Sequence, residues 1–157
     1  MNPSVFFDVY QDRESKGIVS IRLEGDTSHR DQFFQLCIGQ NGFSYRNTSF
    51  FSISNLGKPG ELIHGGDYEH NNGSGGGSFL QERGIHASLR TVGLVEADEG
   101  RFTIVLESSV EIATKAIGQV TGGLGHLTSK NILIRPINSL FIKDCGIILP
   151  MNFDLHT

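Results

Sequence analysis

The chain has 157 residues, a formal net charge of −4, 19% charged residues and 38% hydrophobic residues. This length suits one core, so residues 1–157 are expected to form a single domain, which could be part of a larger protein. An acidic balance argues against nucleic-acid binding, and no apolar run approaches the 18 residues of a membrane-spanning helix. Cys37 and Cys145 lie in apolar patterns without a Cys-x-x-Cys motif, which favours buried thiols and an intracellular location, cytoplasmic or nuclear.

The N-terminal third predicts a β-hairpin followed by a helix. Residues 5–9 and 18–23 are rich in β-branched and aromatic side chains, with a polar stretch between them. Residues 26–28 offer N-cap oxygens, and a helix ending near Gly39 is expected after them. Its apolar positions at helical spacing are Phe33, Leu36 and Cys37.

The remaining elements read mainly as short strands. Residues 43–54, after a turn at 41–42, alternate enough for one or two strands, and residues 102–106 form the clearest strand pattern. Strands are also expected at 62–63, 94–97, 132–135 and 140–143, whereas 113–120 fits either a strand or a helix. Many short strands with one good helix indicate a barrel or a sandwich. The predicted core is Phe6, Val19, Ile21, Phe33, Leu36, Phe102, Ile104, Phe141 and Ile142.

A glycine-rich stretch at residues 62–79 begins with a short apolar pair, Leu62 and Ile63. Its spacing gives neither G-x-G-x-x-G nor a P-loop, and no helix pattern follows, so a phosphate site is not indicated. Residues 71–78 alone would favour a flexible linker. The stretch reads Gly-Gly-Asp-Tyr at 65–68 and Asn-Gly-Ser-Gly-Gly at 72–76. It closely resembles the Gly-Gly-Asp-Phe…Asn-Gly-Thr-Gly-Gly segment of cyclophilins, the β-barrel peptidyl-prolyl isomerases.

Other segments resemble the same family in the same order. Residues 2–9 and 17–23 resemble its first two strands, 33–45 its first helix and the following turn, and 141–146 its closing strand. The resemblance spans about residues 2–148. It implies an all-β or mainly β fold, namely an eight-stranded antiparallel cyclophilin-like barrel capped by helices.

The positions that match the family's active site have changed. Ser52 stands where the family has its catalytic arginine, and the chain has no tryptophan to match the one in the pocket. Only Ala97 keeps the family residue. The full degenerate groove is Ser52, Glu61, Leu62, His64, Ala97, Asp98, Arg101, Thr103 and, at about its aligned position, Thr114.

These changes argue against catalysis. A serine hydroxyl supplies no fixed positive charge and cannot replace a guanidinium fork. Arg101 is displaced from the lost arginine and is expected to be solvated, with Glu99 as a pairing partner. The resemblance therefore implies an inactive domain, without a cofactor or cyclosporin binding, that contacts another protein or peptide segment. A weak isomerase is the alternative.

Three other side-chain groups have ordinary explanations. One group has the residue types of a metal site, namely His64, Asp67 and His70. The resemblance implies that the aspartate is structural, and loop histidines are more often solvated, so no metal is expected. Glu96, Asp98 and Glu99 suit a solvated acidic loop. Ser52 and His64 suggest a serine–histidine pair without an orienting acid.

The chain ends in an unusually apolar segment. It is expected either to bind a partner or to fold back over the barrel. Its apolar members are Ile147, Ile148, Leu149, Met151 and Phe153.

Overall fold

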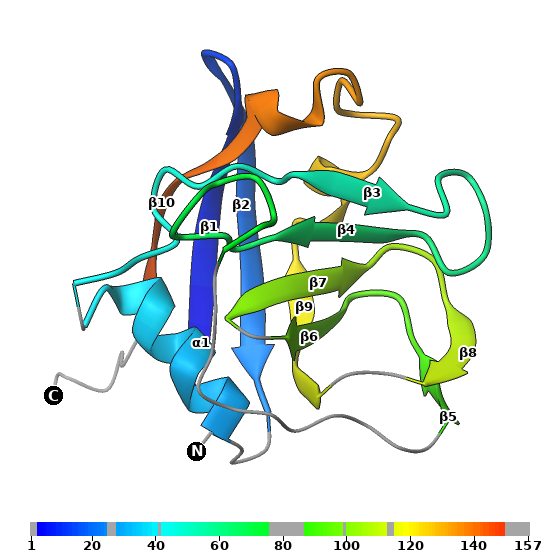
Figure 1. Ribbon diagram of the computed structural model, residues 1–157, viewed down its shortest axis with the longest axis horizontal. Helices are drawn as coiled ribbons and strands as arrows, with labels where there is room; N and C mark the ends of the chain where they lie inside the picture. Colours follow the sequence, from blue (N-terminus) through cyan, green and yellow to red (C-terminus); the bar gives the residue numbers. More distant parts are fainter. Residues whose placement is uncertain are drawn as a thin grey trace, which may run out of the picture.

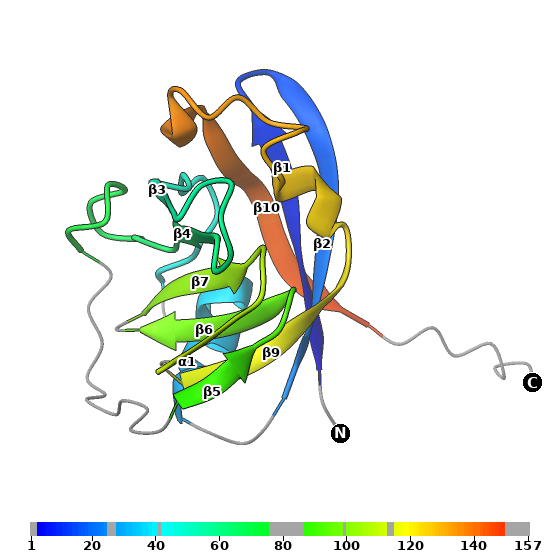
Figure 2. The same cartoon turned by 90° about the vertical axis from the view of Figure 1, so that its right-hand side faces the viewer.

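The structure is a computed structural model, and it describes residues 3–24, 28–40, 42–75, 87–98, 100–112 and 115–149. Its main feature is an eight-stranded antiparallel sheet that curls into a half-barrel, with the helix against one side (Figure 1; Figure 2). No helix within these ranges is long and apolar enough to cross a membrane. The prediction of a mainly β, antiparallel fold is confirmed.

The sheet has the strand order β10-β1-β2-β9-β6-β7-β4-β3, and β5 and β8 form a separate two-stranded sheet. The elements are β1 (Ser4–Gln11), β2 (Glu14–Leu23), α1 (Ser28–Ile38), β3 (Ser52–Ser54), β4 (Leu62–Gly65), β5 (Ala87–Arg90), β6 (Leu94–Asp98), β7 (Arg101–Val105), β8 (Ser109–Ile112), β9 (Lys115–Gly122), the 3-10 turns η1 (Leu124–Leu127) and η2 (Ile137–Ser139), and β10 (Leu140–Ile148).

The predicted hairpin and helix are both present. β1 and β2 pair antiparallel around a turn at Asp12, whose φ of 55° is left-handed. The helix α1 ends at Ile38, and Gly39 follows with φ 72°, which is the conformation that glycine provides after a helix. α1 buries Phe33, Leu36 and Cys37 and packs against β1, β6, β9 and β10. Cys37 and Cys145 are free and buried, as expected, and burial raises the pKa of both thiols.

The strand prediction for residues 132–135 is wrong. The Gln11 side-chain Nε2 donates to the Leu133 carbonyl at 2.7 Å, and the Leu133 N–H donates to Gln11 Oε1 at 2.8 Å. A side-chain amide thus takes the backbone partners that a neighbouring strand would otherwise supply. The ambiguous stretch at 113–120 overlaps β9, so its described part is a strand.

Residues 43–54 form less strand than their pattern predicts. They contain only β3 and a single bridge between Ser49 and Phe141. The backbone before β3 hydrogen-bonds to β10 through Asn47, Thr48 and Phe50. This segment therefore joins the two edges of the curled sheet.

The core is a cluster of aromatic rings inside the curl. Its largest buried rings are Phe7, Phe33, Tyr45, Phe50 and Phe102. The predictions for Phe6 and Phe141 are wrong, because both are only partly buried. Side chains alternate across a strand, and β1 turns Val5, Phe7 and Val9 inward, so Phe6 lies on the other face.

Candidate functional site

Three of the predicted groove residues lie side by side on the sheet. The register pairs Ser52 on β3 with His64 on β4, and His64 with Thr103 on β7. Ile63, Phe102 and Ile104 alternate with them and are buried in the core, so the three polar side chains share the opposite face. All three are partly buried. The structure thus brings the positions 52, 64 and 103 together as predicted.

His64 is held by two hydroxyl groups. Its Nε2 lies 2.7 Å from Ser54 Oγ and its Nδ1 lies 2.9 Å from Thr103 Oγ1. The Phe51 ring is stacked near the imidazole, with 6.3 Å between ring centroids and 21° between planes. Because hydroxyls both donate and accept, either neutral tautomer of His64 is satisfied.

The serine in contact with His64 is therefore Ser54, and the pairing suggested between Ser52 and His64 is wrong. Ser52 lies directly opposite His64 in the register, whereas Ser54 reaches it diagonally. The group at Nδ1 is the neutral hydroxyl of Thr103. A nucleophilic triad would place an orienting carboxylate there, so the geometry does not favour serine hydrolase chemistry.

We predict that Thr103→Val lowers the free energy of unfolding by about 1–2 kcal/mol. Valine keeps the branched shape that suits a strand but leaves His64 Nδ1 without its hydroxyl partner. Urea unfolding measures the change. Thr121→Val is the matched control, because the Thr121 hydroxyl on β9 is exposed and water can replace its contact with Ser20, so the same exchange should cost no more than about 0.5 kcal/mol. Equal costs in both variants would contradict a structural role for the contact between His64 and Thr103.

Glu61 and Leu62 do not line an open groove. Both are buried, and Glu61 Oε2 accepts a hydrogen bond from the Gly57 N–H at 3.3 Å. The Glu61 carbonyl also accepts from the N–H groups of Leu106 and Glu107. Glu61 therefore holds the turn between β3 and β4 against the end of β7.

Two of the predicted groove residues, Ala97 and Asp98, lie on β6, and the structure describes little of their part in the site. Ala97 is buried, pairs in register with Phe102 and belongs to the core cluster. Asp98 pairs in register with Arg101, but its side chain lies outside the described residues. Thr114 and Glu99 also lie outside the described residues.

Arg101 is partly buried and held, in contrast to the expected solvated side chain. Its Nη1 donates to the carbonyl of Gly73 at 2.6 Å. The arginine thereby fastens the first residue of β7 to the glycine-rich loop. Its guanidinium is used for a structural contact between two segments far apart in the sequence.

The glycine-rich loop is organised by Asp67, so a flexible linker is wrong for its described part. The Asp67 side chain is 0% exposed. Its carboxylate accepts hydrogen bonds from five backbone N–H groups at 2.8–3.2 Å, those of Glu69, His70, Asn72, Gly73 and Gly75. Burial by itself raises the pKa of the Asp67 carboxyl, but the backbone N–H groups lower that pKa more, to well below its ordinary value.

This arrangement leaves the Asp67 carboxylate poorly placed to bind a metal ion. Its oxygens are taken by N–H donors, and His70 Nδ1 lies 3.1 Å from Ser74 Oγ. His64 points to Ser54 and Thr103 instead. Among the described residues, no group of three or more His, Cys, Asp or Glu side chains is placed to hold a metal ion.

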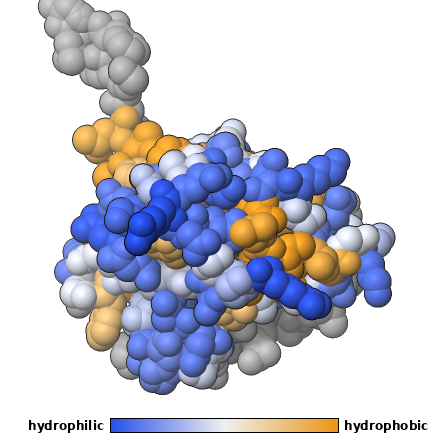
Figure 3. Space-filling view, turned by 90° about the horizontal axis from the view of Figure 1, so that it is seen from above, coloured by the Kyte–Doolittle hydropathy of each residue, from blue (hydrophilic) through white to orange (hydrophobic). Residues whose placement is uncertain are grey.

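The apolar end of the chain is exposed where it is described. Ile147 and Ile148 end β10 with 40% and 39% of their surfaces exposed, and Leu149 is 70% exposed. Figure 3 shows a hydrophobic area beside the grey atoms at one corner of the molecule. Met151 and Phe153 lie outside the described residues.

A scan of the sequence against models of known protein families finds no match.

Proposed function

We propose that this chain is a cyclophilin-like domain that lacks isomerase activity and binds another protein or peptide segment. In this proposal the curled sheet is the cyclophilin barrel and α1 caps one of its ends. The antiparallel strands support it, as do the segments at 2–9, 17–23, 33–45, 65–76 and 141–146 that resemble the family in order.

The observation that carries the proposal is the hydrogen-bonded row of Ser54, His64 and Thr103. It lies on the sheet face where the resemblance places an arginine above an apolar proline pocket. Prolyl isomerisation has a barrier of about 18–20 kcal/mol, and the resemblance implies that the family lowers it with a cation positioned at the twisting amide. Here hydroxyl and imidazole groups hold one another. The neighbouring Arg101 donates to Gly73.

We expect no acceleration of isomerisation above the uncatalysed rate on a proline tetrapeptide in a protease-coupled assay. Ser52→Arg should also stay inactive, because one cation without an apolar pocket leaves the proline ring unpositioned. An ordinary cyclophilin is the positive control. A rate for the wild-type chain within tenfold of that control would contradict the proposal and favour the weak isomerase.

The binding part of the proposal needs a separate experiment. The immobilised chain is used to capture proteins from an extract, and each candidate is purified and titrated against the free chain. A saturable complex that excess free chain displaces from the immobilised chain supports an interaction module. If no purified candidate forms such a complex, the binding part is wrong, whatever the isomerase assay shows.

A further inference from the structure

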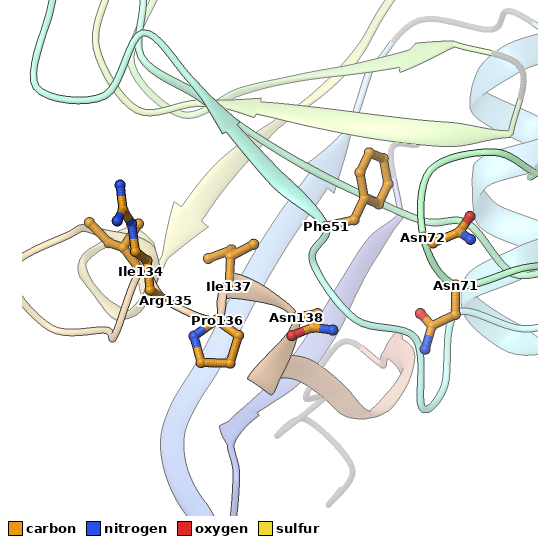
Figure 4. Close-up of a pocket in the computed structure, with 8 residues that line it drawn as sticks. All are labelled: Phe51, Asn71, Asn72, Ile134, Arg135, Pro136, Ile137 and Asn138. Atoms are coloured by element: carbon orange, nitrogen blue, oxygen red, sulfur yellow. The ribbon is translucent and has the colours of Figure 1, made fainter.

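A pocket of about 390 Å³ lies between the Asp67 loop and the segment before β10. Figure 4 shows Asn71 and Asn72 on one side of it and Ile134 and Arg135 on the other, with Phe51 and Ile137 between them. Its volume falls in the range of about 300–1,000 Å³ typical of ligand sites. None of the predicted groove residues lines it.

Both walls of the pocket are fixed by buried polar side chains. Gln11 makes two hydrogen bonds to the backbone of Leu133 and a third to Ser139 Oγ at 3.0 Å, which fixes the segment on one side. On the other side the Asp67 carboxylate holds residues 69–75. A site that is formed in advance loses little conformational freedom when a ligand binds.

The pocket floor is also anchored. Gly73 has φ 94°, and a Cβ built on it would lie 2.8 Å from the Phe51 ring, so the ring rests directly on the loop backbone. Phe51 and Ile137 are partly buried and leave apolar surface in the pocket. An apolar ligand side chain can therefore be sheltered there.

The polar lining consists of donors oriented by the protein. Asn71 Oδ1 accepts from the Ser49 N–H at 2.6 Å, and Asn72 Oδ1 accepts from the Ser74 N–H at 3.0 Å. These contacts fix which end of each amide is the oxygen, so each Nδ2 is left as a donor. Within the described part of the chain, neither Nδ2 nor the exposed Arg135 guanidinium has a hydrogen bond or an ion pair.

No carboxylate lines this pocket, although the chain as a whole carries a net charge of −4. The cation on one side is complementary to a carboxylate, which only accepts hydrogen bonds when ionised. The oriented amide donors on the other side are complementary to the backbone carbonyls of a peptide. Charge complementarity therefore favours a ligand with an acidic group. The apolar floor favours a ligand in which an apolar side chain lies next to that acidic group.

We propose that this pocket binds a short peptide segment of a partner protein in which a glutamate or aspartate adjoins an apolar residue. The carboxylate contacts Arg135, the apolar side chain covers Ile137 and Phe51, and the amide donor of Asn71 on the opposite side bonds to a backbone carbonyl of the peptide. This inference deepens the proposed interaction function and rests on it.

The probe is acetyl-Gly-Ser-Glu-Leu-Ser-Gly-amide, with the glutamine version as its matched partner, titrated into the ¹⁵N-labelled full chain. We expect the glutamate peptide to move the amide signals of residues 71–72 and 134–138 and to bind about tenfold more tightly than the glutamine peptide. Arg135→Gln should remove most of this preference, and Arg135→Glu should abolish it. Because Arg135 is exposed and unbonded within the described ranges, both variants should fold normally.

Arg22→Gln is the matched control, because Arg22 lies on β2 and pairs with Glu24 away from the pocket. It should leave the preference for glutamate unchanged. The inference is overturned by equal affinity for both peptides, by no shift at the pocket, or by inorganic phosphate that moves the same signals equally well. If a captured partner still binds the Arg135→Glu chain with wild-type affinity, the pocket inference fails while the interaction function stands.

Discussion

Phe102→Ala should lower the free energy of unfolding by about 3–5 kcal/mol, which is the usual cost of emptying a large aromatic site in a core. Phe102 is 1% exposed and lies at the centre of the aromatic cluster. The ring centroids of Phe7 and Tyr45 lie 5.2 Å from that of Phe102, and those of Phe33 and Phe50 lie at 5.7 and 6.0 Å.

The loss should be large because the surroundings cannot collapse onto the space. The ring packs on the backbone of the Gly65–Gly66 pair, where an added Cβ would lie 2.9 and 2.7 Å from Phe102. The same backbone leads directly into the Asp67 loop, so it is fixed by other contacts. A domain with a total stability of about 5–15 kcal/mol would be partly unfolded by this loss.

Chemical denaturation followed by circular dichroism measures the change. Phe43→Ala is the matched control, because Phe43 is 55% exposed and its ring packs against Tyr68, which is only partly buried at the edge of the core cluster. It should cost less than about 1 kcal/mol. A Phe102→Ala protein as stable as the control would show that the strand β7 faces the other way.

The sequence pattern predicted the elements whose apolar residues form a pattern within a short stretch of the chain. Residues 5–9 and 18–23 are rich in β-branched and aromatic side chains and lie within β1 and β2, and helical spacing locates α1, which ends just before Gly39. The pair of glycines and the aspartate at 65–67 likewise indicated a loop held at one end. In each of these cases the residues that determine the element lie close together in the sequence, or the apolar residues repeat with the spacing of one strand or one helix.

Where a distant side chain decides the outcome, the pattern fails. Residues 132–135 are apolar enough for a strand, but the amide of Gln11, 122 residues away from Leu133, takes their backbone partners. Two adjacent phenylalanines at positions 6 and 7 look equally apolar, and only the strand pairing shows that Phe7 is the buried one. Propensity carries no information about such register.

The candidate site shows the same limit. Alignment with the family indicated that positions 52, 64 and 103 lie together, and the register confirms their proximity. It could not show that His64 reaches Ser54, or that Arg101 is held by Gly73. The donor-lined pocket had no sequence signal, because its walls meet only in three dimensions.

Asp67→Asn should also cost about 3 kcal/mol or more. The exchange keeps the shape of the side chain but turns one acceptor oxygen into an NH2 donor. Oδ1 of Asp67 accepts two backbone N–H groups and Oδ2 accepts three, so at least two N–H groups lose their acceptor. Each lost hydrogen bond to a charged group costs about 1.5–3 kcal/mol.

The effect should spread beyond the loop. Through Gly73 the loop is fastened to Arg101 and packed on Phe51, and through Asn71 it is bonded to Ser49. Amide hydrogen exchange should therefore speed up at residues 69–75 and also at the start of β7. Exchange that changes only within residues 69–75 would contradict this coupling.

The cost of Asp67→Asn should depend on pH in a defined direction. The pKa of the Asp67 carboxyl is lower in the folded protein than its value of about 3.9 in an unfolded chain. Its stabilisation is therefore complete above about pH 4 and is lost as the pH falls toward the folded pKa. Asparagine does not titrate, so at pH 3 the difference between wild type and variant should be smaller by about 1 kcal/mol than at pH 7.

Urea unfolding of both proteins at pH 7 and pH 3 tests this expectation. Asp31→Asn is the matched control, because Asp31 lies in the first turn of α1 and forms an exposed pair with Arg30. Its cost should stay below about 1 kcal/mol at pH 7. A difference between wild type and Asp67→Asn that is the same at both pH values would mean that the charge of Asp67 does not hold the loop. The five hydrogen bonds would then act through geometry alone, and Asp67→Ala should be the more damaging change at either pH.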